Sequence, residues 1–374
     1  MASLKLIAVG DTGPGDGVGN MFEKVLPWLK SGDLRFAQCE RLLTDKGYKI
    51  DHSTPLTRRV DPKHIVEYEK AGFDVVSMAT NHAMDYGPEG AIGTLENFHS
   101  HGIATIGLGA NIAEARKPAI FEKNGVKVAF LGYCSVITNG ASLPPGYWAT
   151  ERSTGMAPMR ARTYYEAYDY QPATPPHVYS VAEEADVEAM VADIKAAKKL
   201  ADFVVVSMHW GVHHVPRLVA HYQTQAGHAA IDAGCDIILG HHPHILKGVE
   251  VYKGKPILYS MGNFAWDGKH SQPTHSYGAK KSTPQQYYAM DLGPKIKLKY
   301  RQYWSLSVIA EVTLDKESGV SVNLIPVYLD DESYPRVVKP GDPLFEEIIE
   351  FQTWSSEIFG TKWEVKGEKL VLLP

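Results

Sequence analysis

Cysteine is scarce in this chain: the 374 residues contain three, Cys39, Cys134 and Cys235, and no two of them form a C-x-x-C pair. An odd number of widely spaced thiols argues against a disulfide framework, and the absence of C-x-x-C pairs argues against a thiolate zinc site. We therefore predict buried structural thiols, so any metal must be bound by other side chains.

Long apolar runs and an excess of positive charge are also missing. No apolar run approaches the roughly 18 residues that span a bilayer, so no membrane span is predicted. The strand-like residues 6–9 follow the first Met too closely for a signal peptide, so we expect a cytoplasmic chain as written, or an extracytoplasmic one if a leader was removed. The net charge of −5 gives no reason to expect a nucleic-acid partner. The oligomeric state is left open.

Several common catalytic motifs are absent as well. The sequence has no Gly-Lys-Ser/Thr P-loop, no H-E-x-x-H and no G-x-S-x-G, which excludes the nucleotide-binding and hydrolase classes that depend on them. Asp11-Thr12-Gly13 occurs without a second copy, whereas aspartic proteases need two such acids.

The chain instead contains many short apolar runs that end in polar residues. These predicted strands cover residues 4–11, 34–40, 75–81, 126–133, 203–209, 237–242 and 257–263. Helix-like stretches lie between or after them, at residues 62–71, 88–101, 182–200, 217–233 and 343–354. The alternation predicts an α/β fold with a covered sheet, and residues 309–314 and 320–328 are typical of antiparallel strands. We expect one domain over residues 1–374, with irregular insertions near 138–180 and 266–303.

Residues that can bind a metal stand at the ends of several predicted strands. Ligands of open α/β sheets bind beyond the carboxyl ends of the strands, so these side chains are expected to converge. Taken singly, Asp11 and the Asn81–Asp85 turn are equally compatible with solvated or helix-capping roles, and a strand-end glutamate such as Glu40 is more often a solvated charge. The three histidines of Gly240–His244 are harder to explain by packing, because each buried imidazole needs partners for both nitrogens.

Together these oxygen and imidazole groups form a set suited to Mn, Fe or Zn. They exceed one tetrahedral site, and two adjacent metals, typically about 3.5–4 Å apart, would use them. In the Asn81–Asp85 turn, His82 can donate or accept a proton and Asp85 can hold its tautomer.

At this point the pattern resembles the CapA (poly-γ-glutamate capsule synthesis) family, which is similar to calcineurin-like metallophosphoesterases. The matching stretches are Gly10-Asp11, Glu40, residues 81–87, His209-Trp210-Gly211, residues 233–236, residues 240–244 and residues 254–264. The resemblance implies a four-layer α/β/β/α sandwich of mixed sheets with one or two divalent metals at the strand ends. Carried over by motif, it assigns a general acid, His82, with Asp85 beside it, and the ligands Asp11, Glu40, Asn81, His209, His242 and His244.

The sequence departs from the wider pattern at three places. Gly13 stands where metallophosphoesterases usually have a histidine, and Glu40 takes the place of their bridging aspartate. An acid usually follows His-Trp-Gly in the family, whereas this chain has Val212-His213-His214. His213, His214 and His241 are therefore open as additional members of the site.

The leading functional hypothesis is a metal-dependent hydrolase that cleaves an amide, peptide-like, lactone or phosphoester bond. Its substrate would be a small molecule or an anionic polymer, and Arg152, Arg160, Arg162 and Arg217 are candidates for a positive mouth. The alternative is a non-catalytic accessory or binding protein in poly-γ-glutamate or capsule biosynthesis. A third is a structural metal site with every coordination position filled by protein.

Overall fold

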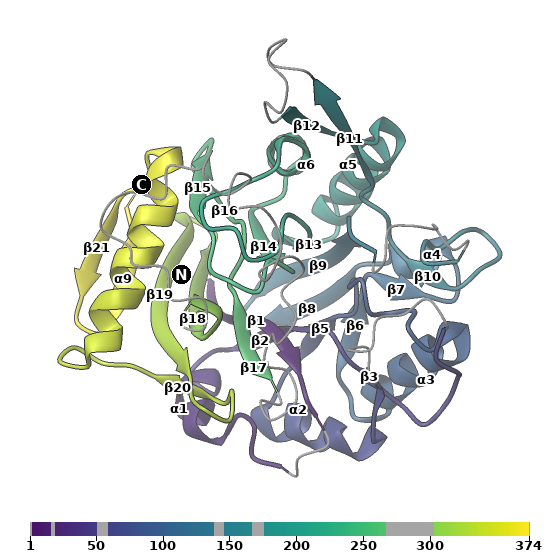
Figure 1. Cartoon of the computed structure of the whole chain (residues 1–374), viewed down its shortest axis with the longest axis horizontal. Coiled ribbons are helices and arrows are strands. Elements are labelled where there is room, and N and C mark those ends of the chain that lie inside the picture. The colour runs from purple at the N-terminus through teal and green to yellow at the C-terminus, as the bar shows by residue number, and fades with distance from the viewer. Residues whose placement is uncertain are drawn as a thin grey trace.

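The computed structural model describes residues 2–15, 19–50, 59–137, 146–166, 176–266 and 303–373. Residues 267–302 of the second predicted insertion therefore lie outside the described residues, as do residues 138–145 and 167–175 of the first. The described part of the first insertion contains a hairpin of β11 (Ala161–Glu166) and β12 (His177–Ala182), which projects beside α6 (Figure 1).

The larger of the two main sheets is ten-stranded and has β1 near its centre (Figure 1). Its order is β21-β22-β19-β18-β1-β2-β5-β6, with β17 beside β1 and β20 beside β19. β1 pairs parallel with β2 and antiparallel with β18, so the sheet is mixed. The strands are β1 (Ser3–Gly13), β2 (Leu34–Cys39), β5 (Val75–Ser77), β6 (Ala104–Ile106), β17 (Asn263–Trp266), β18 (Leu306–Asp315), β19 (Gly319–Leu329), β20 (Pro335–Val337), β21 (Trp363–Lys366) and β22 (Lys369–Leu372).

The smaller sheet is six-stranded, in the order β15-β16-β14-β13-β9-β8. Its central strands β9, β13, β14 and β16 run parallel, and the two edge strands are antiparallel to their neighbours. The strands are β8 (Ala119–Lys123), β9 (Val126–Cys134), β13 (Phe203–His209), β14 (Ile237–His241), β15 (Val249–Tyr252) and β16 (Lys255–Leu258).

Alternating side chains place each sheet between a helical layer and the other sheet. In β1, Leu6 and Ala8 join the core between the sheets, whereas Ile7 and Val9 face the layer that holds α2 and α3. In β13, Val205 belongs to the core between the sheets and Val204 packs toward α5 and α6. This period of two confirms the predicted four-layer α/β/β/α sandwich.

The helices of the outer layers match the predicted stretches, with ends shifted by a few residues. α2 ends where Gly72 adopts a left-handed φ of 77°, and α9 begins at Pro343 behind the capping side chain of Asp342. The longer helices are α2 (Ile65–Ala71), α3 (Gly87–Ser100), α5 (Glu184–Lys198), α6 (His221–Asp232) and α9 (Pro343–Ser356). No described helix is both long and apolar enough to cross a membrane.

The remaining elements are short. They are α1 (Leu26–Leu29), α4 (Ile112–Ala115), the 3-10 helices η1 (Glu23–Val25), η2 (Pro62–His64) and η3 (Glu357–Phe359), and the strands β3 (Leu42–Leu43), β4 (Arg59–Val60), β7 (Leu108–Gly109) and β10 (Gly155–Met156).

The predicted single strand at residues 257–263 is wrong. The chain leaves the smaller sheet at the end of β16 and enters the larger sheet as β17, with Gly262 at a φ of 69° between them. The Gly262 carbonyl accepts the N–H of Asp11 at 2.9 Å. A Cβ atom at Gly10 would lie 2.0 Å from that carbonyl oxygen, so this crossing requires glycine at position 10. The crossing joins the two sheets beside Asp11.

Candidate metal centre

Asp11 lies at an irregularity in the register of β1 and is fully buried. Its Oδ2 accepts the backbone N–H of His242 at 3.0 Å, and its Oδ1 lies 3.3 Å from Nδ1 of His241. The Nδ1 of His244 lies 3.7 Å from Oδ2. The strand end therefore holds Asp11 against the Gly240–His244 run of the other sheet.

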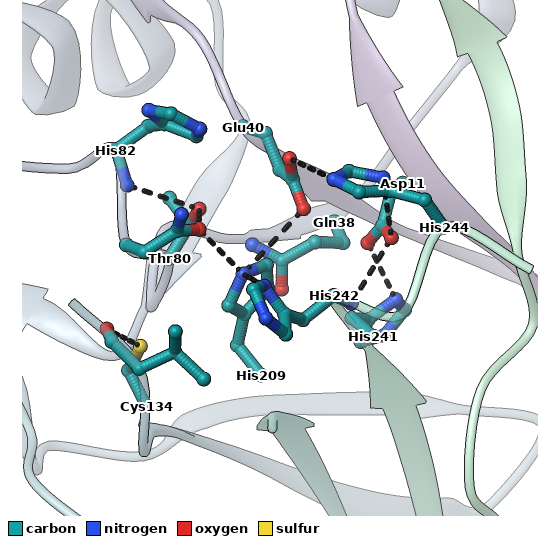
Figure 2. Close-up of polar contacts among 12 residues, drawn as sticks. Asp11, Gln38, Glu40, Thr80, His82, Cys134, His209, His241, His242 and His244 are labelled. Carbon is teal, nitrogen blue, oxygen red and sulfur yellow. Dashed lines mark hydrogen bonds and ion pairs between the residues drawn. The ribbon is translucent and has the colours of Figure 1, made fainter. Parts of the chain in front are cut away.

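Glu40 occupies the middle of the site (Figure 2). Its Oε2 lies 3.6 Å from Nε2 of His244, and its Oε1 lies 3.5 Å from Nε2 of His209. The side chain is buried, and neither oxygen has a hydrogen-bond partner among the described residues. Burial raises the pKa of the Glu40 carboxyl well above its usual range, and the Asp11 carboxylate raises it further.

A second group of candidate ligands surrounds His209. The Nε2 atom of this residue lies 2.8 Å from Asn81 Oδ1 and 3.2 Å from His242 Nδ1. Burial lowers the pKa of both imidazoles, His209 and His242, well below the usual value. They are therefore neutral near pH 7, which is the state in which histidine binds a metal.

The residues present fit a divalent cation. Ligand atoms of Asp11, Glu40 and His244 all lie within 4.8 Å of one another. Two buried carboxylates at this spacing repel each other, and a cation between them would remove both the repulsion and the missing hydrogen bonds. The structure thus brings together all six residues predicted as ligands, in two groups that share Glu40.

His82 and Asp85 form a pair at the edge of these groups. His82 Nδ1 lies 2.7 Å from Asp85 Oδ2, and the His82 side chain is 20% exposed while that of Asp85 is 2% exposed. The contact fixes the orientation of the ring and leaves Nε2 as its other polar atom. This geometry fits the predicted proton donor and its orienting carboxylate.

Two packed side chains, Trp266 and Arg41, occupy the space that a ligand side chain at position 13 would need. A Cβ atom at residue 13 would lie 3.0 Å from two ring carbons of Trp266 and 3.1 Å from Nε of Arg41. The Arg41 guanidinium carbon lies 5.0 Å from the Trp266 ring centroid. Because Trp266 pairs with Gly13 in the sheet register, the space for a histidine side chain is filled.

Two further residues lie beside the ligands: Asn263 was not predicted as a site member, and His241 was left open. Asn263, at the start of β17, lies with its Oδ1 2.8 Å from Nδ1 of His244 and so orients that ring. His241 packs against Phe36, and neither of its ring nitrogens has a hydrogen-bond partner among the described residues. A signal for Asn263 exists in the sequence, because it lies within the matching stretch at residues 254–264.

Three of the four arginines predicted to form a positive mouth contact other parts of the protein, and the mouth itself stays a prediction. Arg160 forms an ion pair with Asp186 at 2.7 Å and Arg162 pairs with Glu183 at 2.8 Å. The Arg217 guanidinium carbon lies 5.0 Å from the ring centroid of Trp354. The partners of these side chains are Asp186 of α5, Glu183 at its N-terminus and Trp354 of α9.

An α/β/β/α sandwich with this carboxylate and imidazole set at the strand ends defines a metallophosphoesterase-like protein. Residues 5–268 match the family model described as "Bacterial capsule synthesis protein PGA_cap". The chain therefore belongs to the PGA_cap family.

Two curated relatives carry related names. The chain is 32% identical to the PGA biosynthesis protein CapA of Bacillus subtilis, over 67% of this chain and 58% of the relative. It is 30% identical to the capsule biosynthesis protein CapA of Bacillus anthracis, over 75% of this chain and 60% of the relative. The matched region thus spans less than two thirds of either relative. Among solved structures, a phosphatase of Mycoplasma pneumoniae aligns with a TM-score of 0.45 and 15% identity, over 88% of this chain and 94% of that chain.

Proposed function

We propose that this chain is a metal-dependent hydrolase acting on an amide, peptide-like, lactone or phosphoester bond. The observation that carries the proposal is the pair of buried carboxylates, Asp11 and Glu40, whose ligand atoms converge with His244 within 4.8 Å. Burying two carboxylates so close together is costly for a protein unless a cation holds them. One or two divalent ions, Mn, Fe or Zn, suit this donor set.

The metal, when bound, would polarise an oxygen of the scissile group and lower the pKa of water beside it. The protein side chains would supply the remaining chemistry. His82 lies beside the ligand groups with its Nδ1 held by Asp85, so its Nε2 can hand a proton to the leaving group. Asn81 and His209 are fixed by their mutual contact and hold the geometry of the site.

The alternative is a non-catalytic accessory or binding role in capsule polymer synthesis. It is favoured by the names of the two relatives, which refer to biosynthesis and not to cleavage. The two functions differ in what His82 does, because only hydrolysis needs a proton donor.

The first test is elemental analysis of the purified protein, with Asp11→Ala and His242→Ala as variants and His221→Ala, an exposed histidine on α6, as a matched control. Near-stoichiometric Mn, Fe or Zn in the wild type and the control, lost in the two variants, supports the metal centre. A folded wild type that takes up no metal on reconstitution overturns the proposal.

A further inference from the structure

The loop that follows β13 brings two additional imidazoles to the metal centre. The ring centroid of His213 lies 3.9 Å from that of His242 and 5.2 Å from that of His244. The neighbouring His214 ring lies 5.7 Å from His244 and 5.1 Å from His213. His213 is exposed and His214 half-buried, so both rings stand between the candidate ligands and solvent.

These two rings form a wall beside the candidate ligands His242 and His244. The planes of the His213, His214 and His244 rings lie within 21° of one another, so the three rings are nearly parallel.

The loop is tied to the scaffold by contacts that leave little freedom to the two rings. The backbone N–H of His214 donates to the carbonyl of Pro243, between two candidate ligands, at 3.0 Å. The buried ammonium of Lys247 donates to the carbonyls of Val215 and, at 3.0 Å, Leu218. Both ends of the segment that follows His213 are thereby attached to the strand-end region of the smaller sheet.

Holding the loop in this shape costs free energy. His214 and Arg217 both have a left-handed φ, at 56° and 60°, which non-glycine residues rarely adopt. Lys247 is 1% exposed, and among the described residues no carboxylate pairs with its ammonium. Strained backbone and a buried, uncompensated cation persist where the surrounding structure enforces them, and such positions cluster at ligand-binding sites.

We propose that His213 and His214 form the substrate-contacting wall of the site and donate ring N–H groups to an oxygen anion of the substrate, a carboxylate or a phosphoryl group, with Lys247 as the residue that positions them. A neutral imidazole carries one N–H donor, so this recognition requires no protonation. The wall supplies polar contacts that the paired arginines do not. The inference rests on the proposed metal centre, because an adjacent cation would hold the same anion.

The test measures anion affinity on the metal-loaded protein by isothermal titration calorimetry, with inorganic phosphate in one arm and glutarate in the other. The variants are His213→Ala, His214→Ala and Lys247→Met, and His221→Ala is again the control. Loss of a hydrogen bond to a charged group weakens affinity by roughly tenfold or more. We expect that loss in the three variants for whichever anion binds the wild type, with metal content unchanged.

Because His213 is exposed, its replacement should not disturb folding, so the His213→Ala result stands even if Lys247→Met fails to fold. For Lys247, a positioning role further predicts that adding His213→Ala to Lys247→Met costs less affinity than His213→Ala costs in the wild type. If metal-loaded His213→Ala and His214→Ala bind both anions with wild-type affinity, the proposed substrate-contacting role of the wall is wrong. A wild type that binds no metal would instead count against the proposed function.

Discussion

The Nε2 atom of His209 lies 2.8 Å from the Oδ1 atom of Asn81, and both side chains are buried. His209 ends β13 of the smaller sheet, whereas Asn81 follows β5 of the larger one. The contact therefore spans the two sheets, and the site exists only where their strand ends meet. Any change that shifts one sheet against the other should alter metal binding before it unfolds either sheet.

Glu40 is expected to matter more for metal content than Asn81. Its two oxygens face His244 and His209 separately, so it belongs to both groups of ligand atoms, whereas Asn81 contacts the His209 group alone. Elemental analysis should show a lower metal content for Glu40→Ala than for Asn81→Ala. Equal loss in two folded variants would contradict a division into two groups that share Glu40.

A histidine introduced at position 13 should fail to become a ligand. Its Cβ would lie 3.0 Å from the Trp266 ring, and overpacking of this kind typically costs about 1–3 kcal/mol. We expect Gly13→His and Gly13→Ala to lower the free energy of unfolding, measured by urea denaturation. Trp266→Leu should relieve part of the cost in the double variants. If Gly13→Ala has the same stability as the wild type, the packing explanation for this position is wrong.

Lys247 should make stability depend on pH above neutrality. Burial lowers the pKa of its ammonium from 10.5 to about 7, so between these values the unfolded chain binds more protons than the folded one. Stability contributed by this group therefore rises with pH over that window. The check is the free energy of unfolding of the wild type minus that of Lys247→Met, measured from pH 7 to 9. This difference in the free energy of unfolding should increase with pH. A difference that does not change with pH would contradict the lowered pKa of Lys247.

The strand pattern predicted an α/β fold with polar residues converging at the strand ends, whereas the four-layer sandwich and the six candidate ligands followed from the resemblance to the CapA family. In a run such as Leu34–Glu40, the apolar residues indicate a buried strand and the final polar residue indicates where that strand ends. Because parallel strands end at a shared edge, the polar residues of several such runs are expected to lie together. The continuous apolar run of residues 6–9 in β1 likewise follows from a strand that is covered on both faces.

Other features of the site depend on contacts with residues far along the chain, so they cannot be predicted from the local sequence. The crossing at Gly262 has the same apolar character as a continuing strand, so residues 257–263 were predicted as one strand. Two of the arginines predicted to form a positive mouth are paired with acids outside their own strand, Arg160 with Asp186 and Arg162 with Glu183. The wall of His213 and His214 depends on where a buried lysine fixes their loop.

Replacement of His82 distinguishes most sharply between the two proposed functions, a hydrolase and an accessory protein. This residue lies outside the two ligand groups, with its Nδ1 2.7 Å from Asp85 Oδ2, so its removal should leave the metal in place. General acid catalysis by a positioned histidine contributes typically about 10²–10⁴-fold to a rate. On a panel of amide, lactone and phosphoester substrates, metal-loaded His82→Ala should lose turnover by that factor, and Asp85→Asn should lose less, because it keeps the ring and weakens only its orientation. Binding of poly-γ-glutamate without cleavage, undiminished in metal-loaded His82→Ala, would instead establish the accessory role, since a binding site has no use for a proton donor.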